Sequence, residues 1–314
     1  MSVSLDHTFT VRPTLIANLR YGLGRTSNNR VPFSDGFDHV ALGLPSYYAE
    51  TAAREGAEFP RFEFSGSVAS LGQFGWTRLY AGALTHSLAG SLTKILSNHT
   101  IKSGGEYRKL FLNYNQQGYP SGQYTFSSGW TQQEITTTST TAGFPLASFL
   151  LGLPSGGYMT HDGTSASASS YFAGYIQDDW KVTRRLTLNI GLRYDLELPR
   201  TERFNRFSFF DMDAPSPIAG LVPASACPAC GNLKGAMKFV TPDNRRQTPT
   251  DRNNFGPRFG FAFQATDKMV LRGGYGMAYP PSPMQACGTT GSCGMEGFRG
   301  QTNFTSTFDS MRSV

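Results

Sequence analysis

The four cysteines are the side chains of this chain best suited to carry chemistry, because they fall into two close pairs. Cys227 and Cys230 are separated by Pro-Ala, and Cys287 and Cys293 by Gly-Thr-Thr-Gly-Ser. A zinc site would need a second pair with two-residue spacing or accompanying histidines, yet no histidine follows His161. A redox CxxC normally opens a helix after a strand, whereas this one lies in a segment rich in Pro, Gly and Ala. We therefore predict two local disulfides formed in an oxidising compartment, with a metal site as the alternative.

Other residue patterns that would indicate catalysis or cofactor binding are missing from the sequence. It contains no HExxH, no GxSxG, no P-loop Gly-Lys pair and no GxGxxG after a strand. Asp178 and Asp179 are adjacent, but adjacent residues of a strand point to opposite faces and cannot share a site without a bulge. The sequence therefore predicts neither an enzyme nor a cofactor.

The charge distribution argues against nucleic-acid binding. The formal net charge is +6, which taken alone suggests a basic surface. The arginines, however, are spread along the whole chain, mostly singly and with acidic residues between them. We therefore expect no nucleic-acid partner.

The elements that position the charged side chains are clearest in residues 171–198, YFAGYIQDDWKVTRRLTLNIGLRYDLEL. From Leu186 to Leu196, apolar residues fall on one face and polar residues on the other, with the period of two that a strand requires. A tilted strand needs about 9–11 such residues to cross a bilayer. No apolar run approaches the roughly 18–20 residues of a membrane-spanning helix.

The same construction recurs in four hairpins with short turns, at about residues 3–24, 84–114, 171–198 and 255–279. Long connections rich in Gly, Ser, Thr, Asn and Pro occupy residues 25–83, 115–170, 199–254 and 280–314. Short turns on one side and long loops on the other are typical of outer-membrane barrels, whose turns lie in the periplasm. The sequence thus predicts an all-β fold: a single antiparallel transmembrane β-barrel segment of about eight long strands, with long extracellular loops, in a Gram-negative-type outer membrane.

Charged residues mark the strand face that must avoid lipid, since an arginine on the lipid face near the midplane costs roughly 2–4 kcal/mol. Turning residues 186–196 over would place Arg193 and Asp195 in lipid and a row of large apolar side chains in water. Leu, Tyr and Phe are therefore predicted to face lipid. The residues predicted to face the lumen are Arg20, Glu106, Arg108, Arg193, Asp195, Arg258 and Arg272.

A soluble β-sandwich or adhesin-like domain is the alternative fold, because its sheets also alternate. Its apolar faces would pack against each other, and its turn signals would recur roughly every 8–12 residues. Strands of about ten residues or more, separated by very long connections, favour the barrel.

Residues 171–211, YFAGYIQDDWKVTRRLTLNIGLRYDLELPRTERFNRFSFFD, resemble the barrel hallmark of TonB-dependent outer-membrane receptors, most closely the Oar-like group. Four further segments fit the same group in the same order: DHTFTVRPTLIANLRYGLGR (6–25), NHTIKSGGEYRKL (98–110), FPLASFLLGLPS (144–155) and NNFGPRFGFAFQATDKMVLRGGYGMAYPP (253–281). The resemblance therefore extends over most of the chain.

This resemblance implies a receptor that binds an unidentified substrate at its outer loops and plug, and imports it with energy from the TonB system. The implied partners are outer-membrane lipid, a plug domain and TonB. The alternatives are a non-transporting surface adhesin or structural outer-membrane protein, and a passive porin.

The sequence departs from the family pattern in lacking a Ton box and a plug-like domain. It has about eight strands where the family barrel has about 22. We therefore expect a fragment of a larger receptor, although an independent eight-stranded barrel is geometrically possible.

Overall fold

The computed structural model describes residues 1–132, 139, 141–223, 225–280, 295 and 297–305. The chain divides into two compact units. Unit 1 comprises residues 1–27, 82–113 and 166–286, and unit 2 comprises residues 28–81, 114–165 and 287–314.

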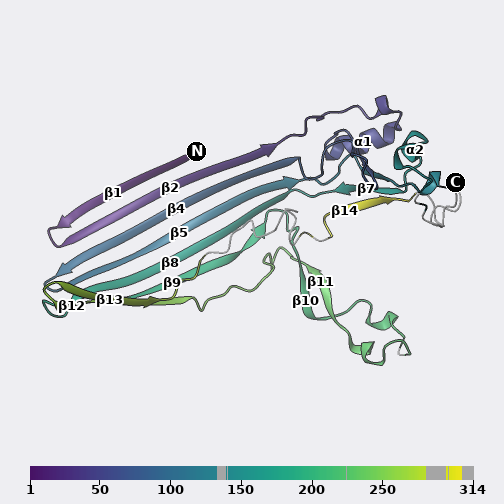
Figure 1. Ribbon diagram of the computed structural model, residues 1–314. Coiled ribbons are helices and arrows are strands. Elements are labelled where there is room, and N and C mark those ends of the chain that lie inside the picture. The colour runs from purple at the N-terminus through teal and green to yellow at the C-terminus, as the bar shows by residue number, and fades with distance from the viewer. Residues whose placement is uncertain (133–138, 140, 224, 281–294, 296, 306–314) are drawn as a thin grey trace. The chain divides into compact units, whose positions relative to one another are not determined.

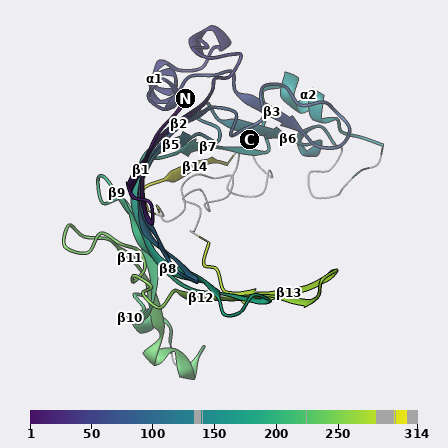
Figure 2. The same cartoon turned by 90° about the vertical axis from the view of Figure 1, so that its left-hand side faces the viewer.

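Unit 1 is built on an eight-stranded antiparallel sheet with the order β1-β2-β4-β5-β8-β9-β12-β13 (Figure 1). Its strands are β1 (Ser2–Arg12), β2 (Leu15–Arg30), β4 (Leu79–Leu96), β5 (His99–Gln116), β8 (Ser165–Lys181), β9 (Leu186–Glu202), β12 (Phe255–Thr266) and β13 (Met269–Gly276). Figure 2 shows the sheet as a curved band. In the part of the chain that the structure describes, β1 and β13 form its two edges, so the barrel wall is not closed.

Short turns join the strands of each hairpin. Between β8 and β9, Thr183 Oγ1 accepts hydrogen bonds from the backbone N–H groups of Arg185 and Leu186 at 3.1 and 3.0 Å. Between β4 and β5 the two-residue turn places Ser97 at a φ of 44°. Such a left-handed residue matches the twist of hairpin strands.

Several strands run further than the alternating pattern predicted. β2 continues to Arg30 rather than to about residue 24, and β9 continues to Glu202 rather than to about residue 198. β8 begins at Ser165, six residues before the predicted start at Tyr171. Backbone pairing needs no apolar face where both sides of the sheet meet water, so these extensions lack the side-chain alternation by which strands are recognised in a sequence.

Unit 2 shows that the long connections predicted between the hairpins contain strands and helices of their own. Its four-stranded sheet has the order β14-β7-β6-β3, and β3 runs parallel to β6. These strands are β3 (Arg61–Phe64), β6 (Gln123–Phe126), β7 (Gly156–His161) and β14 (Gly300–Phe304), and the helical elements are η1 (Val40–Leu42), α1 (Ser46–Glu55), η2 (Gly129–Thr131) and α2 (Pro145–Leu150). The Phe149 ring lies 5.1–5.4 Å from those of Phe62, Phe64 and Phe126. This aromatic core, assembled from distant segments, has no periodic signal in the sequence.

The connection from β9 to β12 also contains structure. It forms a hairpin of β10 (Ser208–Pro215) and β11 (Lys234–Phe239), with short helices η3 (Ala219–Leu221) and η4 (Pro228–Asn232) between them.

Register divides the large sheet into an apolar and a polar face. On the apolar face Leu192 pairs with Ile176, and Ile190 with Phe259. These four side chains are 45–54% exposed. On the polar face Asn189 pairs with Asp179, and Arg20 with Asp6. A soluble sandwich would bury such apolar rows under a second sheet, so their exposure is that of a membrane-facing wall.

We predict that Leu192→Arg blocks barrel assembly while Asn189→Arg is tolerated. The residues directly opposite Leu192 are Ile176 and Pro257, so a charge there would face apolar neighbours; an arginine facing lipid near the midplane costs about 2–4 kcal/mol. An arginine at residue 189 would face Asp179. Heat-modifiable gel migration of the two variants checks this, and equal assembly of both would contradict the face assignment.

Candidate functional site

A network of polar side chains occupies the polar face where β5, β8 and β9 adjoin. Arg193 Nε donates to the two Asp195 oxygens at 3.0 and 3.2 Å. Arg193 Nη2 donates to the Tyr171 hydroxyl at 2.9 Å, and that hydroxyl donates to Asp195 Oδ1. The carboxylate of Asp195 is thus held by two donors while only 5% of the residue is exposed.

Two residues of β5 extend this network. Arg108 Nε donates to Glu106 Oε1, and Arg193 Nη2 lies 3.8 Å from Glu106 Oε2. The Arg108 guanidinium lies 5.3 Å from the Tyr171 ring centroid. The two arginines balance the two carboxylates, so the network fixes its side chains without leaving a net charge.

The strand period and the register explain why these residues meet. Glu106 and Arg108, like Arg193 and Asp195, are two residues apart and therefore share a face. The register places Arg193 opposite Tyr175 and Asp195 opposite Ala173, which brings Tyr171 diagonally next to Asp195. Diagonal neighbours of this kind are within reach of long side chains.

A second, exposed network lies on β1 and β2. Arg20 Nε forms an ion pair with Asp6 Oδ2 at 2.5 Å, and Asn18 donates to Asp6 at 2.6 Å and to Thr8 at 3.0 Å. The Arg20 and Asp6 side chains are 62% and 36% exposed.

The remaining polar-face cations predicted from the sequence form no ion pair with these networks in the described part of the chain. Arg258 lines a hollow of about 180 Å³ together with Lys102, Gln177 and the network residue Arg193. Arg272 lies opposite Ala262. Within the described ranges, Lys102, Arg258 and Arg272 form no ion pair. This part of the wall is therefore positively charged.

The structure adds residues to the site that the sequence analysis did not predict. Tyr171 was not predicted, because an aromatic residue in a strand has no sequence signal that separates a network member from an ordinary strand former. Asp178 lies opposite Ile190 on the apolar face, where its carboxylate accepts from His99 Nδ1 at 2.6 Å. The His99 ring stacks on Trp180 with centroids 5.3 Å apart. This cluster lies next to the tight turns, where an interfacial aromatic belt is expected.

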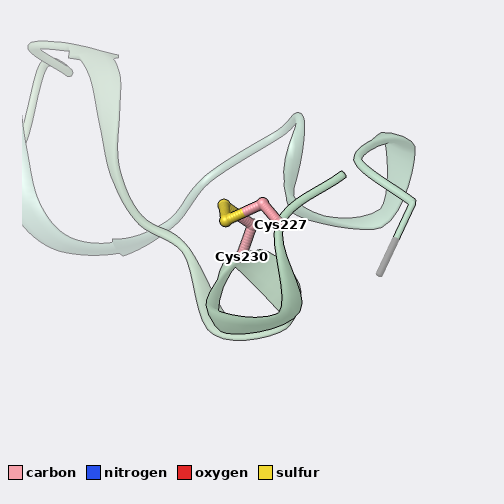
Figure 3. The surroundings of a disulfide bond; sticks show 2 residues. All are labelled: Cys227 and Cys230. Atoms are coloured by element: carbon pink, nitrogen blue, oxygen red, sulfur yellow. A yellow bond between two sulfur atoms is a disulfide. The ribbon is translucent and has the colours of Figure 1, made fainter. Parts of the chain in front are cut away.

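The structure joins Cys227 and Cys230 in a disulfide, with their Cα atoms 5.3 Å apart (Figure 3). The second predicted pair, Cys287 and Cys293, lies outside the described residues. Over the described ranges, no three His, Cys, Asp or Glu side chains are arranged to hold a metal ion. None of the described helices is both long and apolar enough to cross a membrane.

Unit 2 contains a buried ionisable cluster around Glu58. Arg78 Nη2 lies 2.6 Å from Asp35 Oδ1 and 3.9 Å from Glu58 Oε2. His39 Nε2 is 2.9 Å from the Glu58 carbonyl oxygen. Glu58 Oε2 has no hydrogen-bond partner in this part of the structure. Burial raises the pKa of the Glu58 carboxyl to about 7, although the Arg78 charge opposes the shift.

Comparison with known proteins places this geometry in context. The profile of a family described as Outer membrane beta barrel domain matches residues 1–312. No curated protein sequence matches the chain.

Among solved structures, the chain is similar to the copper transporter OprC, with 11% identity and a TM-score of 0.39 over 90% of this chain and 30% of that chain. It is also similar to the open form of the ferric-catecholate import receptor Fiu from E. coli K12, with 13% identity and a TM-score of 0.32 over 89% of this chain and 47% of that chain. The chain spans less than half the length of either structure.

We predict that Arg193→Met destabilises the folded sheet by about 3 kcal/mol, because it leaves the buried Asp195 carboxylate without its cation. The figure is the lower end of the range for a broken buried pair, since the Arg193 side chain is itself 24% exposed. Arg20→Met is the control, and an exposed pair should give no resolvable change. Urea unfolding in detergent micelles measures both; equal losses would contradict the network's role.

We predict that unit 2 becomes less stable as the pH rises from about 4.5 to about 7. Glu58 keeps its proton in the fold up to about pH 7, whereas the unfolded chain loses it near 4.5. The resulting stabilisation is complete at low pH and disappears above the folded-state pKa. Hydrogen exchange at residues 56–64, corrected for intrinsic rates, should therefore be faster at pH 8 than at pH 5. Glu58→Gln should remove the difference and the exposed control Glu50→Gln should retain it; a difference that persists in Glu58→Gln would refute this origin.

Proposed function

Because the chain belongs to the outer membrane beta barrel domain family, we propose that it supplies wall and outer loops of a TonB-dependent receptor of the Oar-like group. Such a receptor imports an unidentified substrate across the outer membrane with energy from the TonB system. The observation that carries the proposal is the polar face of the sheet, where charged side chains are fixed by mutual hydrogen bonds and further cations remain unpaired.

The fixed network supports a lumen that contacts another protein surface. A water-filled pore needs only hydrated polar groups, whereas a wall that meets a plug needs side chains of defined position. In this network each pair among Tyr171, Arg193 and Asp195 is joined by a hydrogen bond. We propose that this wall faces the plug, supplied by residues beyond this chain.

The unpaired cations suggest which chemistry the lumen favours. Lys102, Arg258 and Arg272 add positive charge to the polar face and form no ion pair with a carboxylate of the described residues. A positive wall attracts anionic groups at close range. We propose that these residues meet acidic side chains of the plug or anionic groups of the cargo.

The folded connections of unit 2 support ligand capture at the cell surface. Their aromatic core holds the backbone of these segments in a defined arrangement. A preformed binding surface loses less conformational entropy on binding than a disordered loop would. Loops that carry function on barrels are held by the rigid scaffold in the same way.

Sequence similarity supports the choice of group. The QDDWKVT and LTLNIGLRY segments that resemble the Oar-like barrel form the β8–β9 hairpin, which also carries most of the polar network. A non-transporting surface adhesin remains the second candidate, because a preformed outer surface would serve adhesion equally well.

We predict that cells lacking the gene and cells lacking TonB fail to deplete the same compound from a defined mixture in the medium. The reason is that both the receptor and its energy source are needed for import. Mass spectrometry of spent medium from wild-type, gene-deleted and TonB-deleted cells measures the depletion. Loss of surface attachment in the gene-deleted cells with every uptake rate unchanged would favour the adhesin and refute the transporter.

A further inference from the structure

A basic hollow lies on the apolar face of unit 1, at the strand ends that lead into the long connections. It has a volume of about 710 Å³ and is lined by residues of β2, β4, β5, β8 and β9 and of the connection from β9 to β12. Leu84 and Phe111 supply apolar surface, and Ala168 lies beside them. Phe111 belongs to the apolar face, because its ring contacts that of His86, which in turn is bonded to Tyr21 on the same face.

Four cations line this hollow: Arg25, Lys109, Arg203 and Arg245. We call them the rim site. None of the other lining residues is acidic. A hollow with four positive charges and no negative charge on its walls is complementary to an anion.

The rim-site cations have only neutral partners among the described residues. Lys109 Nζ donates to Ser170 Oγ at 3.0 Å and lies 5.6 Å from the Phe111 ring centroid. Arg245 donates to the Asn205 side chain and to the Glu202 carbonyl oxygen, both at 2.6 Å. Arg25 and Arg203 form no ion pair in the described ranges, and both are exposed. The four charges are therefore uncompensated by carboxylates.

The position of the rim site along the strands places it at the membrane surface. Lys109 is eleven residues beyond Asn98 in its tight turn, and Arg25 is eleven residues beyond Thr14 in its own. At about 3.3 Å per residue and a tilt near 45°, both lie about 25 Å above the periplasmic turns. This distance equals the height of about 25 Å expected for the apolar band of an outer-membrane barrel. Lys109 and Arg25 are thus level with the outer lipid headgroups.

We propose that the rim site binds the phosphate of an anionic lipid headgroup in the outer leaflet. The hollow opens on the face that meets lipid, so its occupant comes from the membrane. The cations hold the phosphate at the surface, and the acyl chains follow the apolar surface of Leu84 and Phe111. This inference needs the membrane orientation of the sheet but is independent of transport.

The test compares a phosphate lipid with a neutral lipid of identical chains. Native mass spectrometry of the full chain in detergent micelles measures the affinity for dimyristoyl phosphatidylglycerol and for dimyristoyl phosphatidylcholine. The double variant Lys109→Gln/Arg203→Gln should bind phosphatidylglycerol at least tenfold more weakly than the wild type, with binding of phosphatidylcholine unchanged. Heat-modifiable migration verifies that each variant is folded.

Two controls separate the site from general charge. Arg184→Gln/Lys268→Gln removes the same net charge at the tight turns and should leave lipid affinity unchanged, and Lys109→Arg/Arg203→Lys should retain it. Equal weakening by Arg184→Gln/Lys268→Gln would overturn the proposal. So would complete competition by equimolar inorganic phosphate, because the ligand would then be a free anion rather than a lipid.

Discussion

The structure depends on one constraint: a strand that crosses a bilayer has one face in hydrocarbon. Its charged side chains must therefore lie on the other face, which is formed by every second residue. Backbone groups find their partners in neighbouring strands, which leaves side-chain direction as the remaining variable. Arg193 and Asp195 satisfy this constraint on β9, and Glu106 and Arg108 satisfy it on β5. The polar network follows, because charges confined to one face of adjacent strands are brought within hydrogen-bond reach by the register.

The same constraint explains which parts of the fold could be predicted from the sequence. The strand pairs around the tight turns, and the face to which Arg193 and Leu192 belong, follow from alternation alone. The Tyr171 contact does not, because it depends on the diagonal offset between β8 and β9. The strand extension to Glu202 was missed because side chains on both faces of that segment are polar or meet water, and alternation is then not required.

The contacts within unit 2 could not be predicted from residue alternation. Phe62 and Phe149 lie far apart in the sequence, and their ring centroids are 5.3 Å apart in the structure. The parallel pairing of β3 with β6 likewise joins strands separated by two hairpin strands, β4 and β5. No periodic pattern of apolar residues predicts such contacts, since each segment contributes only a few residues to the core. A buried carboxyl such as Glu58 could be found only after those contacts were known.

The rim site shows where charged side chains are tolerated on the apolar face. Lys109 lies on the same face as Leu192, yet it costs little there because its ammonium group is level with the headgroups rather than with the acyl chains. Long cationic side chains can cover apolar surface with their methylene groups while the charge remains in a polar layer. Cations are therefore tolerated on the apolar face only in a narrow zone. Lys109 and Arg25 lie in that zone and share one hollow with Arg203 and Arg245. None of the four forms an ion pair among the described residues, so the adjoining lipid phosphates are best placed to neutralise their charge.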